Sequence, residues 1–472
     1  MESSTSLVVY ASLTVLVYIC VTNLLAKGNS PLPPGPRGLP LIGNALDLPR
    51  AGEFEARHWA KHKELYGNIS SVTVFGQTLI IINDAKLAQI ILNDRSAKHS
   101  SRSKMTFAGE MQAGSVILKV VYGYTAEQFK ADPLLNTVRK VVDEFGIAAK
   151  PGAFMVDLIP LLKYVPGWVP GAGFKTTAKQ WRSNLESSVE EPAAFVKQQM
   201  AEGKDNTSFL SQLKQNNLTA EEASENKWLA ASLYAAGADT TVSAITTFFL
   251  AMTLFPEAQK EAQHELDQVI GTCRLPTLSD RPNLPYLNAL VKEVLRWHPV
   301  GPMGLPHTTS QDDVIEGYLI PKGAMILPNI WCGSKSFYIL GLMIDILNRQ
   351  ICHDATLYHD PMTFIPERFL GPRAETDPGR FVFGFGRRIC PAQQMSEKTL
   401  FLNIAQTLAV FSIGAKAGVE MPKAEFMSGV VSHPKPFETV ILPRSDEHRK
   451  LIKAIEYIHP WQESDAEVLA RF

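Results

Sequence analysis

Four residues in the stretch FVFGFGRRICPAQQ have types and spacing that suit a metal centre. They are Phe383, Gly386, Arg388 and Cys390. Glycine has no Cβ, so a loop that contains it can pass close beneath a flat cofactor. Arg388 can reach an anionic group on the rim of such a cofactor. The arrangement therefore predicts a loop that presents one cysteine sulfur to a planar group.

Cys390 precedes a helix that we expect from Pro391 to about Phe411. Proline suits the first helical position, and the N–H groups of a helix start lower the pKa of a nearby thiol. A thiolate as the sole protein ligand of a haem iron pushes electron density onto the metal and favours O–O cleavage. We predict haem b with Cys390 as its axial ligand. The alternative is a glycine-rich surface turn beside a buried, inert cysteine.

A long helix should position a second group of reactive side chains. Thr219 and Glu222 form a capping box that opens it, and it should end before Pro256. Between Lys227 and Glu257 its only charged residue is Asp239. An acid isolated in apolar surroundings is costly and marks a functional site.

In this helix we expect Thr240 to hydrogen-bond dioxygen or water and Asp239 to pass protons inward. Gly237 should thin the helix so that a ligand can approach its backbone. The structural alternative pairs Asp239 with a distant arginine and lets Thr240 bond back to its own helix.

Glu293 and Arg296 stand at i and i+3 of another expected helix, where they can pair. Arg368, in the sequence PERF, adds a second guanidinium. One carboxylate between two arginines would make a charge-assisted cluster that holds the loop leading to the cysteine. Taken alone, the pair is better explained by a solvated helix face.

Elsewhere the pattern predicts a mainly α fold with small peripheral β-sheets. Two β-branched runs around Phe75-Gly76-Gln77 form a hairpin pattern, and most of the sequence after Ala126 reads as helical. The expected hairpin strands are 69–74 and 78–82; the further helices are 256–270 and 285–298; the further strands are 314–320, 325–327 and 439–442. No nucleotide-binding glycine loop is present in the sequence.

Charge and cysteine content exclude several classes of protein. The net charge is −1 and no long basic run occurs, so nothing points to nucleic acid. The five cysteines are scattered, without a CxxC pair, which indicates a reducing compartment rather than a disulfide framework.

The N-terminal segment Leu7–Ala26 holds 20 residues without a charge, long enough to span a bilayer. Glu2 and the absence of a basic n-region argue against the alternative, a cleaved signal peptide. Lys27 and Arg37 follow the segment, which places the rest of the chain on the cytoplasmic side. Five prolines between residues 31 and 40 then form a semi-rigid spacer. We expect residues 1–30 to be an anchor with its flank.

Together these motifs resemble the cytochrome P450 family, in particular membrane-anchored fungal microsomal members. The tract 161–178 is similar to basidiomycete members related to O-methylsterigmatocystin oxidoreductase. By resemblance, Cys390 is the axial haem ligand, and Arg388 and His307 hold haem propionates. Asp239 and Thr240 match the proton-delivery pair.

The same resemblance makes Glu293, Arg296 and Arg368 the structural triad, and it assigns Phe383 and Gly386 to the cofactor loop. Ala392 replaces the usual glycine after the cysteine, which the family tolerates.

The resemblance implies that residues 31–472 form a haem-thiolate monooxygenase domain with an N-terminal transmembrane helix. It would hydroxylate a small lipophilic substrate (a steroid, terpenoid or aromatic type) with O2 and with electrons from NADPH-cytochrome P450 reductase. Secondary metabolism or xenobiotic oxidation is the expected setting, on the endoplasmic reticulum membrane with the catalytic domain cytoplasmic. The expected pocket residues are mostly apolar: Leu233, Ala236, Val300, Met303, Leu305 and 427–431.

Two departures from the family pattern bear on activity. The WxxxR helix that contacts haem propionates is not found, and several helical turns are missing near residues 110–115. Conversely, an apolar insert without helix caps occupies residues 332–350. We interpret these as a skipped exon and a retained intron, so one alternative is an inactive or haem-poor product of a defective gene model. A reductase-independent haem-thiolate isomerase or dehydratase is another, against which the Asp-Thr pair argues.

Overall fold

The computed structural model describes most of the chain between residues 30 and 469. Within this span the residues not described are 41, 51–52, 100–114, 128–129, 149–153, 159, 205–206, 214–217, 332–336, 340–341, 345–350, 459 and 461. The expected anchor at residues 7–26 therefore lies outside the described residues, as do most of the residues around the expected deletion.

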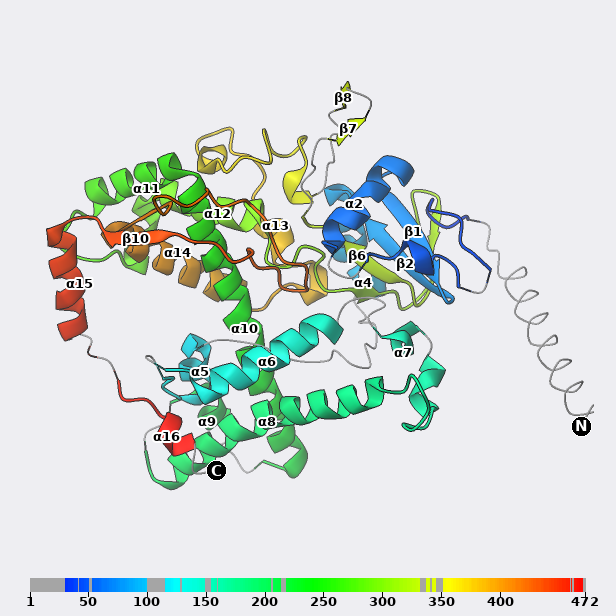
Figure 1. The fold of residues 1–472 in the computed structure, drawn as a ribbon, viewed down its shortest axis with the longest axis horizontal. Helices are drawn as coiled ribbons and strands as arrows, with labels where there is room; N and C mark the ends of the chain where they lie inside the picture. The colour runs from blue at the N-terminus through cyan, green and yellow to red at the C-terminus, as the bar shows by residue number, and fades with distance from the viewer. Residues whose placement is uncertain are drawn as a thin grey trace, which may run out of the picture.

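Helices dominate the described chain and the sheets are small, as the sequence predicts (Figure 1). The helices are α2 (Glu55–Tyr66), α3 (Ala85–Ala88), α4 (Ser96–His99), α5 (Ser115–Tyr122), α6 (Pro133–Ala148), α7 (Met155–Leu158), α8 (Phe174–Ala201), α9 (Phe209–Leu213), α10 (Ala220–Leu254), α11 (Pro256–Val269), α12 (Pro285–Trp297), α13 (Gly379–Val382), α14 (Gln393–Val410), α15 (Asp446–Ile458) and α16 (Ala466–Leu469). The strands are β1 (Ile69–Val74), β2 (Gln77–Ile82), β3 (His307–Thr308), β4 (Asp313–Ile315), β5 (Tyr318–Ile320), β6 (Met325–Pro328), β7 (Phe337–Ile339), β8 (Leu342–Ile344), β9 (Phe411–Gly414) and β10 (Val440–Pro443).

Helix α10 runs through the middle of the molecule (Figure 1). It begins at a capping box, in which Thr219 and Glu222 each bond the other's backbone N–H, as the sequence predicts. Its C-terminal half packs against α11, α12 and α14, and its N-terminal half against α5, α6, α8 and α9. This central position explains why its middle section is so poor in charge.

The main sheet has the strand order β1-β2-β6-β3 and carries the hairpin that the sequence predicts. Its tight turn places both Phe75 and Gly76 at positive φ, 47° and 85°. The predicted strand 314–320 is wrong in one respect, because it is two strands, β4 and β5, paired as a hairpin. Glu316 and Gly317 both have positive φ there, so the chain reverses where an alternating pattern suggested continuity.

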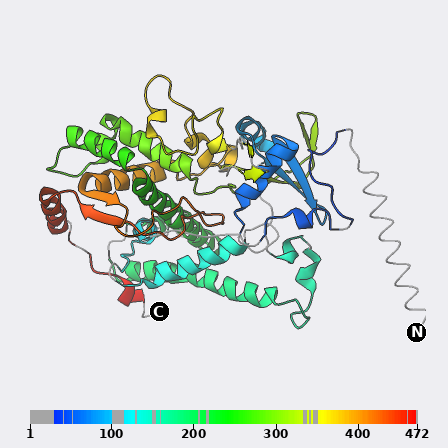
Figure 2. The ribbon, with the colours of Figure 1, turned by 45° about the horizontal axis from the view of Figure 1, so that its top comes forward.

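A large hydrophobic core lies among α10, α11, α12 and α14. Leu290 of α12 and Phe401 and Ile404 of α14 are fully buried within it. In Figure 2, α6 and α8 run side by side below this group, and the structure packs them against each other. The core thus keeps α10 and the start of α14 in a fixed relation, which is what a site between them requires.

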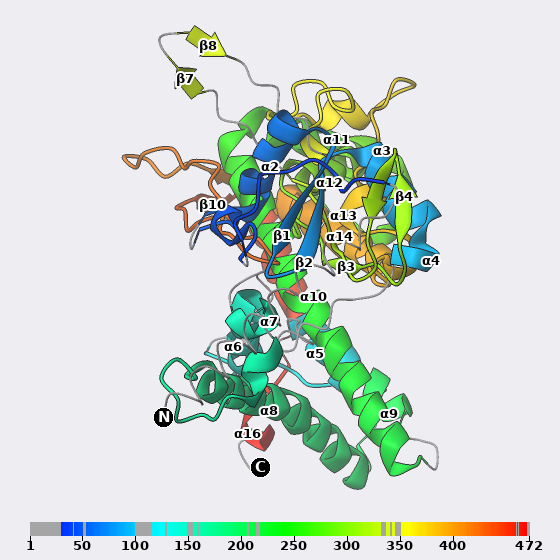
Figure 3. The same ribbon diagram turned by 90° about the vertical axis from the view of Figure 1, so that its right-hand side faces the viewer.

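Part of the insert at residues 332–350 forms the antiparallel hairpin β7–β8, with Phe337 opposite Ile344. The hairpin stands apart from the other elements, at the upper left in Figure 3 and at the top in Figure 1. In the described part of the chain, no one helix has the length and hydropathy needed to cross a bilayer, although α10 and α11, bent by 104°, meet both requirements as a pair.

Candidate active site

Cys390 lies in the loop between α13 and α14, just after a 3₁₀ turn at Gly386–Arg388. Its N–H donates a hydrogen bond to the carbonyl oxygen of Phe383 at 2.7 Å, which folds the loop back on itself. The Cys390 side chain is half-buried, whereas Cys352 is buried and Cys273 exposed. Among these three described cysteines, only Cys390 is neither sealed in the core nor on the open surface.

The helix that follows the cysteine differs from the expectation. Helix α14 begins at Gln393, so the predicted start at Pro391 is two residues early and Cys390 does not cap the helix. Burial raises the pKa of the Cys390 thiol, and a hydrogen bond from the Ala392 N–H lowers it only in part. The predicted fall in pKa from the helix terminus is therefore wrong for the chain by itself. Bonding to a metal ion, which deprotonates a coordinating thiol outright, would supply the thiolate.

Gly386 has a structural neighbour that the sequence did not indicate. Its φ is 55°, and a Cβ added to it would lie 2.3 Å from the carbonyl oxygen of Leu92. Its N–H donates to the side-chain oxygen of Asn93. Both partners belong to the π-helical segment Gln89–Asp94, against which the cysteine loop packs. Close packing against this segment is reason enough for a glycine here.

We expect Gly386→Ala to destabilise the protein more than a change at an equally positive but uncrowded glycine. Gly271 has φ 73° and nothing within 4 Å of an added Cβ, so Gly271→Ala is a matched control. Both variants bear the strain of a positive φ, about 1–3 kcal/mol. Only Gly386→Ala must also displace the Leu92 carbonyl. Urea unfolding measures both losses, and equal losses would contradict this packing role.

The predicted proton-delivery pair lies in the middle of α10. The Thr240 hydroxyl donates to the Ala236 carbonyl at 2.7 Å, so in this structure the threonine bonds back to its own helix. Asp239 is not isolated, as its place in the sequence suggested. Its Oδ2 lies 2.9 Å from Nε2 of His433, and about a quarter of its side chain is exposed. The alternative of an arginine partner is also wrong.

His307 and Arg388, the predicted propionate partners, occupy different elements. His307 belongs to β3 and is buried, with Nδ1 2.8 Å from the carbonyl oxygen of His99. Arg388 ends the 3₁₀ turn beside Cys390, and its residue is exposed. Arg388 thus shares a loop with the thiol, whereas His307 is attached to α4 by way of His99.

A charged cluster around Asp313 was not foreseen. Asp313 at the start of β4 accepts hydrogen bonds from Arg95, Lys98 and His99, each at 2.9–3.1 Å. Burial raises its pKa, but the hydrogen bonds from Lys98, Arg95 and His99 outweigh this and hold the pKa below its ordinary value. The cluster ties α4 to the β4–β5 hairpin. Asp313 lies more than 200 residues from its three partners in the sequence, so spacing carried no signal.

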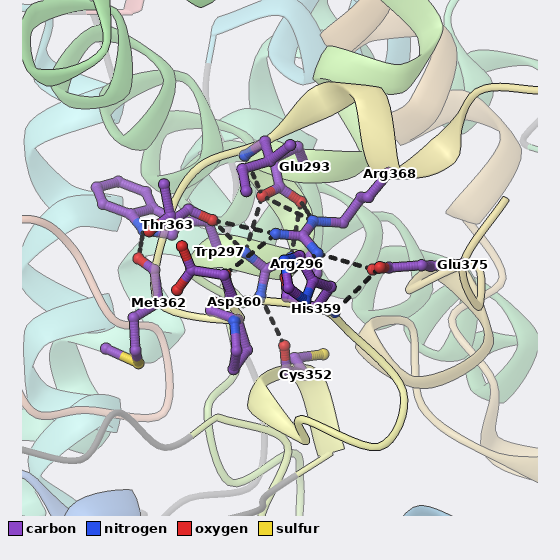
Figure 4. A network of polar contacts seen from close by, with 12 residues as sticks. Glu293, Arg296, Trp297, Cys352, His359, Asp360, Met362, Thr363, Arg368 and Glu375 are labelled. Carbon is purple, nitrogen blue, oxygen red and sulfur yellow. Dashed lines mark hydrogen bonds and ion pairs between the residues drawn. The ribbon is translucent and has the colours of Figure 1, made fainter. Parts of the chain in front are cut away.

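Glu293 and Arg296 form a bidentate ion pair in the core (Figure 4). Arg296 Nε and Nη2 donate to the two carboxylate oxygens at 2.7 and 2.8 Å. Neither side chain has exposed surface, so the alternative of a solvated helix face is wrong. Burial disfavours the charged guanidinium, but its bonds to Glu293 outweigh this and raise the pKa of Arg296.

Arg368 joins this cluster from the turn Pro366–Phe369 (Figure 4). Its Nε lies 3.3 Å from Glu293, and its Nη1 donates to Glu375 at 2.7 Å. Glu375 was missed by sequence reasoning. The two arginines also donate to the backbone carbonyls of Cys352, His359, Asp360, Pro361 and Thr363. The cluster therefore fixes the irregular segment that leads toward the cysteine loop.

Apolar side chains remain uncovered on the segments expected to surround the cofactor. Val242 of α10 is 52% exposed, Ile389 beside Cys390 is 48% exposed, and Leu305 is 45% exposed. Met303, also expected in the pocket, is buried. A flat apolar group would cover such surface, and a lone half-buried thiol with an adjacent arginine is a donor set of a haem-thiolate site. The residues present fit haem.

The family model described as Cytochrome P450 matches residues 113–336 and 341–441. A cytochrome P450 monooxygenase ppsD from Aspergillus oryzae is 41% identical, over 93% of this chain and 94% of that protein. The monooxygenase claR from Ampulloclitocybe clavipes is 38% identical, over 96% and 94%. O-methylsterigmatocystin oxidoreductase from Aspergillus flavus is 36% identical, over 94% and 93%.

The fold, the cysteine loop and these matches define a haem monooxygenase, an oxidoreductase that incorporates oxygen from O2. The chain belongs to the cytochrome P450 family. Its resemblance to fungal members, O-methylsterigmatocystin oxidoreductase among the relatives, is confirmed. The alignments with ppsD and claR extend over 514 and 526 positions, more than the 472 residues of this chain. Both relatives therefore carry residues without a counterpart here.

Proposed function

We propose that this chain hydroxylates a small lipophilic substrate of steroid, terpenoid or aromatic type, in secondary metabolism or xenobiotic oxidation. Electrons come from NADPH through NADPH-cytochrome P450 reductase. The observation that carries the proposal is the half-buried Cys390 in its closed loop, within a chain of this family. Uncovered apolar residues, Ile389 in that loop and Leu305 before β3, support a lipophilic substrate.

When bound, the haem supplies the redox chemistry that activates dioxygen, and the protein supplies its ligand, its orientation and its electrostatics. Cys390 would be the ligand, and the Phe383 carbonyl accepts the backbone hydrogen bond that holds the cysteine in place. Arg388 and His307 would hold the propionates. Gly386 keeps the loop packed against the segment before α4.

Protons reach the reacting oxygen through α10 in this proposal. Asp239 exchanges protons with water, since its carboxylate is partly exposed. Thr240 is the next residue, and its hydroxyl oxygen keeps two acceptor lone pairs while it donates to Ala236. It can therefore accept a hydrogen bond from a water that carries the proton inward.

Turnover with reductase, NADPH and ¹⁸O2 tests this function on a panel of lipophilic substrates. We expect one ¹⁸O atom in the product, and we expect Thr240→Ala to lower the product formed per NADPH several-fold because the proton path is broken. Thr246→Ala is the matched control, since Thr246 makes the same bond to its own helix, at 2.8 Å to Val242. Product without ¹⁸O, or equal coupling in both variants, would contradict the proposal.

We also propose that residues 1–30 anchor the chain in the endoplasmic reticulum membrane, with residues 31–472 as a cytoplasmic haem domain. The uncharged run Leu7–Ala26 and the basic residues after it support this arrangement. We expect the full chain to sediment with the microsomes and a chain that starts at residue 31 to stay in the supernatant. Equal sedimentation of both would count against the anchor.

The second candidate is an inactive or haem-poor product of a defective gene model. One observation favours it: the relatives carry residues that this chain lacks. A propionate without its arginine partner in a buried site costs several kcal/mol. Sequencing the transcript across codons 105–120 and 331–352 decides between the two, because an intact reading frame with extra codons near 110 would identify the skipped exon.

A further inference from the structure

The C-terminal loop at residues 426–434 supplies a partner to Asp239 that spacing along the chain does not reveal. His433 Nε2 lies 2.9 Å from Asp239 Oδ2, although the two residues are 194 positions apart. The His433 side chain is 21% exposed and that of Asp239 is 25% exposed. The imidazole therefore meets the carboxylate at a place that water can still reach.

Backbone bonds hold the loop that carries His433. The Met427 N–H donates to the His433 carbonyl at 2.7 Å, and Phe426 pairs with Pro434 as an isolated β-bridge. These contacts close the loop into a narrow turn. The direction in which the His433 ring leaves the backbone is set by this turn.

Ser432, the residue before His433, is hydrogen-bonded to α10 without the participation of His433. The Ser243 hydroxyl donates to the Ser432 carbonyl at 2.6 Å, one helical turn beyond Asp239. The Ser432 hydroxyl bonds to the Met427 carbonyl at 2.7 Å, and it lies 2.9 Å from Nε2 of His298. Ser243, Ser432 and His298 are buried.

These buried bonds attach the loop to α10 without any help from His433. An ion pair that is partly exposed adds little to stability. Stabilising the position of the loop is therefore a poor explanation of the His433–Asp239 contact. What it does control is the carboxylate itself, because a hydrogen bond from the imidazole restricts the rotamer of Asp239 and occupies one of its two oxygens.

We propose that His433 is a positioning residue for proton delivery: it holds the Asp239 carboxylate beside Thr240 and leaves the other oxygen to exchange protons with water. This inference rests on the proposed function, in which Asp239 moves protons. Without His433, the carboxylate turns toward solvent and the delivery of protons slows. Electrons from NADPH are then lost as hydrogen peroxide.

The first experiment measures hydrogen peroxide formed per NADPH in the holoenzyme with reductase. We expect His433→Leu to raise this fraction several-fold, and His433→Gln to restore most of the coupling because its amide N–H can donate to Asp239. The matched control is His58→Gln on α2, since His58 also pairs with a carboxylate, that of Glu53 at 3.2 Å, at similar exposure. His58→Gln should leave the fraction unchanged.

The second experiment observes the carboxylate itself and does not depend on turnover. In crystal structures of the holoenzyme we expect the Asp239 side chain to change rotamer in His433→Leu and to keep its present rotamer in His433→Gln. An unchanged Asp239 rotamer in His433→Leu would overturn the inference.

The two hypotheses fail differently. If Asp239→Asn does not change peroxide formation, the proposed proton role of Asp239 is wrong, and the role of His433 is wrong with it. If Asp239→Asn uncouples the enzyme but His433→Leu does not, the inference about His433 alone is overturned. If His433→Leu uncouples and His433→Gln does so equally, the hydrogen bond is not the cause, and the inference is again overturned.

Discussion

Replacing Cys390 with alanine should remove thiolate-ligated haem from the protein. The reason is that no other described cysteine can substitute for it. Cys352 is completely buried, and burial raises the pKa of its thiol to about 12. Cys273 is exposed, on a different part of the chain. The measurement is the Soret band of the reduced protein with carbon monoxide, which reports the axial ligand.

Two further variants sharpen this prediction. Cys390→His offers the iron a neutral imidazole, so any haem retained should lose the spectral signature of thiolate ligation. Cys273→Ala is the control and should leave the spectrum unchanged, because that side chain is exposed and distant in sequence from the loop. An unchanged band in Cys390→Ala would refute the assignment of the ligand, and with it the proposed oxygenase chemistry.

Replacing Glu293 with glutamine should cost the fold about 3–5 kcal/mol, because it leaves two buried guanidinium groups without their shared carboxylate. The Glu293 and Arg296 side chains have no exposed surface, and that of Arg368 has 2%. A protein of ordinary stability has about 5–15 kcal/mol to lose. Urea unfolding measures the loss, and a lower soluble yield at 37 °C should accompany it.

The control for Glu293→Gln is an exposed ion pair of the same chemistry. Arg182 and Glu186 on α8 make an i,i+4 pair at 2.8 Å, with side chains 78% and 51% exposed. Water already solvates these charges, so Arg182→Ala should leave the unfolding transition where it is. If the unfolding midpoint of Glu293→Gln shifts no more than that of Arg182→Ala, the buried cluster does not hold the loop in the way that the structure implies.

Several elements could be predicted because their causes are local. The hairpin β1–β2 follows from two β-branched runs around a short turn, and α10 begins at the predicted capping box. Helices α11 and α12 start at the expected prolines and end within one residue of the predicted positions. In each case the residues that decide the structure are neighbours in the sequence.

Other predictions failed where a local pattern met a tertiary constraint. The strand expected over residues 314–320 divides at Glu316-Gly317, both at positive φ. The thiol expected to be acidified by a helix terminus has a raised pKa instead, since burial of Cys390 outweighs the single bond from Ala392. Burial is a property of everything packed around a residue, which a motif does not contain.

The sequence by itself determined the family, and it predicted the cysteine ligand and the acid–threonine pair, because each depends on residue type and short spacing. Only the tertiary structure decided how these groups are held. It brings His433 to Asp239, Glu375 to Arg368 and the Leu92 carbonyl to Gly386. Except for Glu375 and Arg368, these partners are separated by well over a hundred residues, and they meet because packing of the core helices brings the loops around them together. No periodicity along the chain encodes such meetings.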